Sequence, residues 1–97
     1  MFKPIIVIIN LSVHPGTESR FLEYTTQNVK ERLVASGCLS VDFYQREDEP
    51  YRFVLIEVFE TQESIDLYYE SSSYLTWHKQ VDGLIEKVSG ADYIQRN

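Results

Sequence analysis

The chain has 97 residues, a formal net charge of −6 at pH 7 and a hydrophobic fraction of 43%. This length suits one domain, which we expect to span residues 1–97, and the apolar fraction is too high for a disordered chain. Because nucleic-acid binders neutralise phosphates with basic side chains, the acidic balance excludes that class, and it also disfavours binding to an anionic membrane surface. The one cysteine cannot form an intramolecular disulfide and no apolar run is long enough to span a bilayer, so we expect a cytoplasmic protein.

The N-terminal third predicts a strand followed by a helix. Residues 5–13 are rich in β-branched side chains, and their odd positions stay apolar while the even positions become polar from Asn10 onwards. This pattern predicts a strand with one uniformly dry face. Thr17 suits the N-cap of a helix over residues 18–35, which Gly37 would close. The side chains that recur at every fourth position of this helix are Phe21, Thr25, Val29 and Leu33.

The middle of the chain predicts a hairpin and a short helix. Residues 39–44 alternate between apolar and polar, as a half-buried strand does. A polar turn at residues 47–50 separates them from a second strand at residues 51–60, so the two strands should pair. Thr61 suits the cap of the next helix, which should end near Glu70.

The C-terminal part predicts one longer helix and a short strand. Serines at residues 71–73 break the preceding helix, and helical spacing of apolar side chains continues over residues 74–88. Gly90 would end this helix, and residues 91–96 would form a terminal strand. The side chains on one face of this helix would be Tyr74, Trp77, His78, Val81, Leu84, Ile85 and Val88.

The predicted order is β-α-β-β-α-α-β, an α+β fold of ferredoxin-like type. Such a split βαβ arrangement gives a four-stranded antiparallel sheet with its helices on one face. The predicted strands are too apolar to leave the other face in water, so we expect a homodimer that covers it.

Six short segments carry a resemblance to a known family. They are Val13-His14-Pro15-Gly16, Phe21-Leu22, Gly37-Cys38-Leu39, residues 52–59, Glu63-Ser64-Ile65 and residues 71–77. With these segments the chain resembles the antibiotic biosynthesis monooxygenase family, which has the dimeric α/β-barrel fold. The resemblance spans residues 5–88. The family includes cofactor-free oxygenases of quinols and polycyclic phenols, heme-degrading oxygenases, and isomerases of small phosphorylated diketones, so the fold alone does not choose the reaction.

Two residues are the candidate catalytic groups. His78 lies on the predicted apolar helix face, where it is either a general base toward a phenolic proton or a core histidine with satisfied nitrogens. Tyr68 occupies the position of a family histidine, and its hydroxyl either holds a substrate oxygen or ends in water. The resemblance also aligns His78, four residues after Tyr74, with the histidine of the heme-degrading branch.

The remaining candidates would bind substrate. Glu57 shares a strand face with apolar side chains, so it either tunes a base or pairs with an arginine. Asn10 either orients the substrate or makes a polar contact across the dimer interface. The expected walls of the pocket are Trp77, Tyr74, Leu55 and Phe59.

No HExxH, HxxxH or CxxC pattern is present in the sequence, so we predict no metal site. The resemblance then implies a cofactor-independent monooxygenase that acts on a quinol-like or hydroxy-aromatic small molecule. The alternatives are a heme-binding or heme-degrading monooxygenase, a small-molecule isomerase, and a non-catalytic ligand-binding dimer of the same fold.

Overall fold

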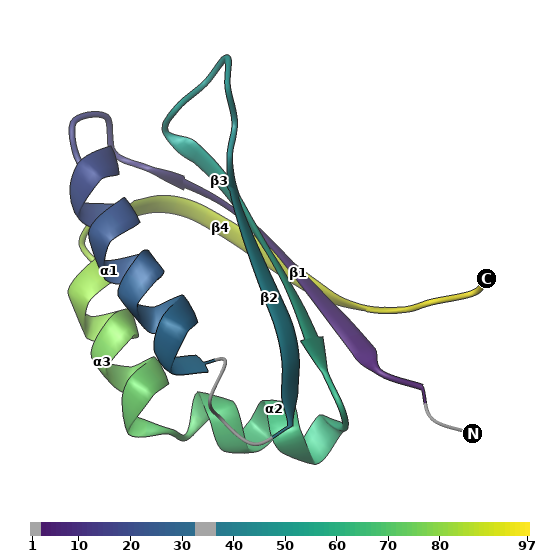
Figure 1. The fold of residues 1–97 in the computed structure, drawn as a ribbon. Helices are drawn as coiled ribbons and strands as arrows, with labels where there is room; N and C mark the ends of the chain where they lie inside the picture. The colour runs from purple at the N-terminus through teal and green to yellow at the C-terminus, as the bar shows by residue number, and fades with distance from the viewer. Residues whose placement is uncertain (1–2, 33–36) are drawn as a thin grey trace.

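The computed structural model describes residues 3–32 and 37–97, which form a four-stranded antiparallel sheet and three helices. The elements are β1 (Ile5–Val13), α1 (Glu18–Arg32), β2 (Cys38–Gln45), β3 (Arg52–Phe59), α2 (Gln62–Tyr69), α3 (Ser72–Val81) and β4 (Ile85–Ile94). The strand order is β2-β3-β1-β4, and the helices lie on one side of the sheet (Figure 1). This arrangement confirms the predicted α+β, ferredoxin-like fold. In the described part of the chain, no helix is both long and apolar enough to cross a bilayer.

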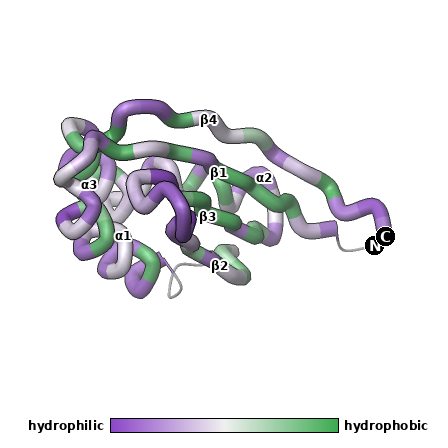
Figure 2. The backbone as a smooth tube through the Cα atoms, turned by 90° about the horizontal axis from the view of Figure 1, so that it is seen from above, coloured by the Kyte–Doolittle hydropathy of each residue, from purple (hydrophilic) through white to green (hydrophobic). Residues whose placement is uncertain are grey.

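The two central strands divide the molecule into a covered side and an uncovered side. On β1, the odd-numbered Val7, Leu11 and Val13 are buried under the helices, as the alternation predicts. The opposite side, which we call the open face, carries half-buried apolar side chains, and Figure 2 shows hydrophobic residues concentrated along β1 and β3. The residues that define the open face are Ile6, Ile8, Val54, Ile56 and Val58.

Aromatic rings fill the layer between α1 and the sheet. Phe21 of α1 is fully buried, and its ring centroid lies 4.8 Å from that of Phe53 and 5.9 Å from that of Phe43. Trp77 of α3 closes the layer with its ring centroid 6.5 Å from that of Phe21. These offset and edge-on contacts fix α1 and α3 on the same face of the sheet.

The buried stripe of α1 differs from the predicted one. The sequence predicted apolar positions at every fourth residue, but the buried residues are Phe21, Thr25, Asn28 and Arg32. Their spacing of four, three and four residues follows the true helical period, and it turns Val29 to a half-buried position. The predicted Leu33 and the predicted helix end at residue 35 lie outside the described residues.

The predicted helix over residues 74–88 is wrong at its C-terminal half. Helix α3 ends at Val81, and residues 85–94 form β4, which pairs with β1 along its whole length. Val88 therefore lies opposite Leu11 on the sheet, and Gly90 lies opposite Ile9 instead of closing a helix. The apolar residues at positions 84, 85 and 88 are compatible with a helix and with a strand. The segment forms a strand because it pairs with the edge of β1.

Gly37 lies directly before β2 and packs closely against Ser64 in the first turn of α2. Its φ angle of +84° lies in the left-handed region, as the sequence predicted. A Cβ atom at this position would overlap with Ser64 Oγ and would lie 2.5 Å from Ser64 Cβ. The Ser64 backbone N–H donates to Thr61 Oγ1, so Ser64 is fixed by the cap of α2 and cannot easily move aside.

We predict that Gly37→Ala destabilises the protein more than Gly16→Ala. Gly16 also has a positive φ, of +96°, but a Cβ there would meet nothing within 4 Å. Gly16→Ala should therefore lower the free energy of unfolding by about 1 kcal/mol from backbone strain alone. Gly37→Ala should cost about 1–3 kcal/mol more because of the contact with Ser64. Urea denaturation measures both values, and equal losses would contradict the role of this contact.

Candidate functional site

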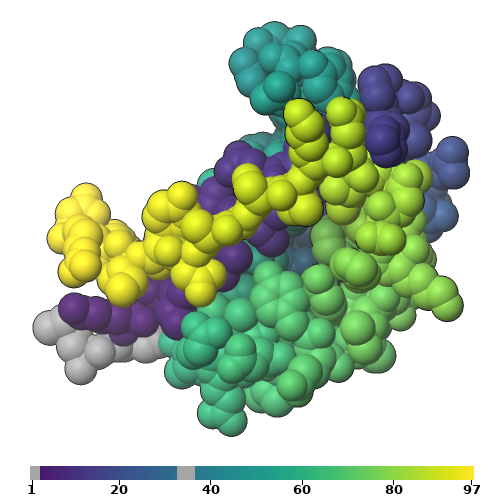
Figure 3. All heavy atoms as spheres, turned by 180° about the vertical axis from the view of Figure 1, so that it is seen from behind, coloured from purple at the N-terminus to yellow at the C-terminus, as the bar shows by residue number. Residues whose placement is uncertain are grey.

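A groove of about 560 Å³ runs between α3 and β4 on the covered side of the sheet. Figure 3 looks onto the β4 edge of the sheet, where β4, in yellow-green to yellow, crosses above the green atoms of α2 and α3. Apolar side chains of β1 form its floor, and the helices and β4 form its walls. Its lining residues are Val7, Ile9, Leu11, Tyr69, Tyr74, Trp77, His78, Asp82, Ile85, Glu86, Val88, Gly90, Ala91 and Asp92.

Aromatic residues on either side of the α2–α3 junction form the helical wall. The Ser71 hydroxyl accepts a hydrogen bond from the Tyr74 backbone N–H, which starts α3 immediately after α2. The tight junction brings the Tyr69 and Tyr74 rings to a centroid distance of 4.7 Å at an interplanar angle of 83°. Trp77 lies one turn further along and donates its indole N–H to Thr25 Oγ1 at 3.0 Å. The groove therefore presents an ordered aromatic surface to a planar ligand.

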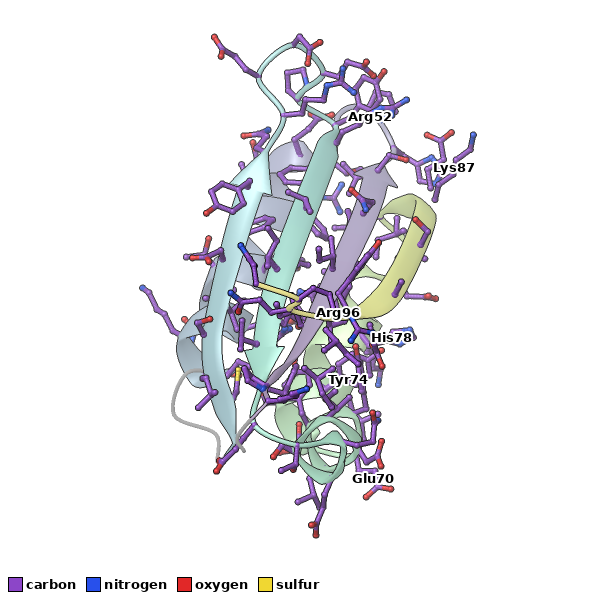
Figure 4. All side chains as sticks on the ribbon, turned by 90° about the vertical axis from the view of Figure 1, so that its right-hand side faces the viewer. Arg52, Glu70, Tyr74, His78, Lys87 and Arg96 are labelled. Carbon is purple, nitrogen blue, oxygen red and sulfur yellow. The ribbon has the colours of Figure 1, made fainter. Side chains whose placement is uncertain are left out.

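His78 lies at the mouth of the groove and not on the buried stripe of α3. Its side chain is 54% exposed, whereas the adjacent Trp77 is buried. Successive helical residues point about 100° apart, so both cannot occupy the stripe. The imidazole Nε2 lies 3.9 Å from Asp82 Oδ1, and the ring centroid lies 5.7 Å from that of Tyr74. Figure 4 shows Tyr74 and His78 side by side on α3.

Tyr68 does not share a cavity with His78, which corrects the sequence-based expectation. Its side chain is buried behind the groove, with its ring centroid 5.9 Å from that of Phe59. Its hydroxyl accepts a hydrogen bond from Asn28 Nδ2 at 3.1 Å. The neighbouring Tyr69 takes the groove-lining position instead, because the two side chains project from different sides of α2.

Glu57 forms an ion pair with Arg32 in the interior, as one of the two alternatives for it predicted. Both side chains are 1% exposed. Arg32 Nη2 donates to Asn28 Oδ1 at 2.5 Å, and the guanidinium carbon lies 4.4 Å from the centroid of the Tyr68 ring. Among the described residues, Arg32 Nε and Glu57 Oε1 have no hydrogen-bond partner. We call Asn28, Arg32, Glu57 and Tyr68 the buried polar cluster.

Burial shifts the titration of these groups in a consistent way. Desolvation lowers the pKa of Arg32 and raises the pKa of Tyr68. It also raises the pKa of Tyr69 and Tyr74 at the groove. The two groove phenols therefore stay protonated near neutral pH, where they can donate hydrogen bonds to a ligand oxygen.

Leu55 and Phe59 are core residues and do not line the groove. Both are fully buried on β3, which lies on the far side of β1 from β4. Of the four predicted pocket walls, Trp77 and Tyr74 line the groove, whereas this pair does not. The wall opposite the helices comes from β4, whose residues 85–88 the sequence had assigned to a helix.

Asn10 lies on the opposite side of the sheet from His78. It is exposed on the open face, where it lines a second hollow of about 840 Å³. Arg52 and Lys87 border this hollow, and both lie toward one end of the sheet in Figure 4. The neighbouring Ile9 faces the groove, because adjacent strand residues point to opposite faces.

Sequence reasoning missed several charged residues at the groove. Asp82 follows His78 by four residues, a spacing that places both on one side of a helix and could have identified the pair. Glu86 was hidden by the incorrect extension of α3 across residues 82–88, whereas Asp92 fell in the predicted terminal strand, which carried no signal that it borders the groove. Arg32 was missed because a strict four-residue spacing predicts position 33 on the buried stripe, whereas the helical period places residue 32 there.

Comparisons with known proteins agree with the fold. The sequence model of the antibiotic biosynthesis monooxygenase family matches residues 4–80. A solved structure from Nitrosomonas europaea that carries the same family name is 28% identical, with a TM-score of 0.92 over 98% of this chain and 92% of that chain. A structure from Pseudomonas aeruginosa is 18% identical, with a TM-score of 0.93 over 100% and 98% of the two chains. An uncharacterized protein of Synechocystis sp. is 24% identical over 87% of this chain. The matched region covers 57% of the length of that relative.

We predict that the buried polar cluster tolerates only paired changes. Glu57→Gln should lower the free energy of unfolding by about 3–5 kcal/mol, because it leaves the Arg32 cation buried without its counter-charge. Arg32→Met combined with Glu57→Met should recover most of this loss, since it removes both charges. Urea denaturation of Glu57→Gln, of the single variants Arg32→Met and Glu57→Met, and of the double variant measures these losses and the coupling between the two residues.

The control is the exposed pair of Arg46 and Asp48, whose Nε–Oδ1 distance is 2.6 Å. Asp48→Asn should cost much less stability than Glu57→Gln, because both side chains of this pair are exposed and water screens their charges. A loss in Glu57→Gln no larger than that in Asp48→Asn would contradict the prediction.

Proposed function

The chain belongs to the antibiotic biosynthesis monooxygenase family, as its sequence resemblance predicted, and we propose that it is a cofactor-independent monooxygenase acting on a hydroxy-aromatic small molecule in the groove. The observation that carries this proposal is an imidazole, His78, with a carboxylate beside it at the mouth of an aromatic-lined groove. The family name of the 28% identical structure from Nitrosomonas europaea supports oxygen chemistry.

The lining of the groove suits a planar phenol. Val7, Ile9 and Leu11 offer an apolar floor, and the rings of Tyr69 and Tyr74 offer an aromatic wall. The protonated hydroxyls on this wall would donate hydrogen bonds to a substrate oxygen. Tyr69 of α2 would therefore hold the substrate oxygen, which is the role that the sequence suggested for Tyr68.

Tyr68 would instead be a positioning residue. Its ring centroid lies 5.6 Å from that of Tyr69 and 5.5 Å from that of Tyr74, so it supports both groove phenols from behind. Its own hydroxyl is occupied by Asn28.

In the proposed reaction His78 removes the phenolic proton, and Asp82 supplies a counter-ion to the imidazolium. The electron-rich aromatic anion then transfers one electron to dioxygen, and the radical pair combines to form a carbon–oxygen bond at a free para carbon. The resulting hydroperoxide takes back the proton and loses water, which leaves a para-quinone. One oxygen atom enters the product and the other leaves in water with two substrate hydrogens, so no external reductant is needed.

The residues around the groove do not suit heme. Its propionates would need cationic partners, but Asp82, Glu86 and Asp92 are the charged side chains that line the groove beside His78. The same carboxylates would repel the phosphate of a phosphorylated diketone. We therefore propose neither alternative for this chain.

We also propose that two copies associate through their open faces. Apolar side chains of the central strands meet across this face, where Ile8 lies opposite Ile56 and Ile6 lies opposite Val58. Tyr44 and Tyr93 extend the patch on the edge strands and are 53% and 50% exposed. A continuous apolar surface of this kind favours a self-complementary partner.

We predict that purified protein incorporates one atom of ¹⁸O₂ into 1-naphthol or 1,5-dihydroxynaphthalene. His78→Ala should lower kcat by about 10²–10⁴-fold, because the general base is lost. The matched control is His14→Ala, which changes the other histidine of the chain, exposed between β1 and α1. Oxygen uptake and mass spectrometry of the product measure both variants.

An unchanged rate in His78→Ala, or no labelled product from any hydroxy-aromatic tested, would contradict the proposed function. Saturable binding without any turnover would favour the non-catalytic ligand-binding module.

We predict that Ile56→Lys converts the dimer to a monomer in sedimentation-velocity experiments, because it places a charge at the centre of the open face. The control is Leu75→Lys, since Leu75 is an apolar residue of α3 that is 56% exposed on the covered side. This variant should sediment as the wild type does. A monomeric wild type, or a dimer that survives Ile56→Lys, would exclude the open face as the interface.

A further inference from the structure

We infer that the groove selects its ligand by charge and prefers an aromatic molecule that bears a protonated amine over one that bears a carboxylate or phosphate. This inference rests on the proposed function, because it concerns the same groove. It goes further by naming the chemical class of the substrate.

The first support is the position of three carboxylates around the groove. Asp82 lies at the C-terminus of α3, Glu86 at the start of β4 and Asp92 near its end, and all three line the groove. Glu86 and Asp92 are six residues apart on a strand, which is about 20 Å, so negative charge lies near both ends of the groove. An amine would meet a carboxylate in either orientation of a bound aromatic ring.

The second support is where the nearby basic side chains point. Arg32 is buried behind the tyrosines and pairs with Glu57. Arg52 and Lys87 both lie opposite Ser12 and border the hollow on the open face, on the other side of the sheet. Figure 4 shows Arg52 and Lys87 at one end of the sheet, away from Tyr74 and His78. None of these cations lines the groove, and neither Lys79 of α3 nor Arg96 does, so the charged side chains that line it beside His78 are the three carboxylates.

The third support is the aromatic wall itself. The faces of tyrosine and tryptophan rings attract a cation, and Tyr69, Tyr74 and Trp77 all line the groove. The carboxylates and the ring faces thus favour the same ligand charge. Because Asp82 is 75% exposed, water and salt screen its share, and the preference should be moderate and should weaken with ionic strength.

The test uses three compounds that share a naphthylmethyl group and differ in the charge of the group attached to it: 1-naphthylmethylamine, 1-naphthylmethanol and 1-naphthylacetate. The readout is the NMR signal of the Trp77 indole N–H, which is unambiguous because the chain has one tryptophan. At low salt the amine should bind about tenfold more tightly than the carboxylate, with the alcohol between them. The difference should shrink in concentrated salt.

A pair of triple variants separates local charge from net charge. Asp82→Asn with Glu86→Gln and Asp92→Asn should remove the preference for the amine over the carboxylate. The control set makes the same change in net charge at exposed carboxylates that do not line the groove, and it should keep the wild-type order. The control substitutions are Glu23→Gln, Glu47→Gln and Glu60→Gln.

Equal or tighter binding of the carboxylate by the wild type would overturn the inference, as would loss of the preference in the control variant. In both cases binding of the alcohol leaves the proposed site standing. Failure of all three compounds to shift the indole signal would overturn the proposed function and the inference together.

Discussion

Arg32 carries a positive charge into the layer between α1 and the sheet, and the surrounding structure is arranged around it. Glu57 supplies the counter-charge from β3, and the Tyr68 ring lies over the guanidinium. An unpartnered ion in such a layer costs several kcal/mol, so the positions of α1, β3 and α2 depend on one another. Since Tyr68 also contacts Tyr69 and Tyr74, this ion pair supports the aromatic wall of the groove from behind.

The fold was predictable wherever the apolar residues fit the two-residue period of a strand or the 3.6-residue period of a helix, but not both. Residues 5–13 alternate strictly on their odd positions, and β1 has the predicted bounds. The hairpin strands and α2 are similarly marked by alternation, a polar turn and the Thr61 cap. Residues 82–90 carry no such distinction, because their apolar positions fit a helix as well as a strand. Only the pairing of β4 with β1, a contact between residues far apart in sequence, resolves them.

The candidate site was predictable in its residue types more than in its geometry. Trp77, Tyr74 and His78 do come together, because all three belong to one helix. Tyr68 and Tyr69 are adjacent, so only the packing of α2 against the sheet decides which of them reaches the groove. Glu86 could not be placed at the site while its segment was assigned to a helix, and Asp92 could not be placed there without the pairing of β4 with β1.

The exposed edge strand β4 links the proposed dimer to the proposed site. Nearly every residue of β4 is exposed, so the strand is held mainly by its backbone pairing with β1. Alternate side chains point to the two sides of the sheet, with Asp92 and Gly90 toward the groove and Ala91 and Tyr93 in register with Ile8 and Ile6 of the open face. A second copy on the open face would cover Tyr93 and restrain the strand. The outer wall of the groove would then be set in part by association, although the two grooves lie on the far sides of the paired sheets.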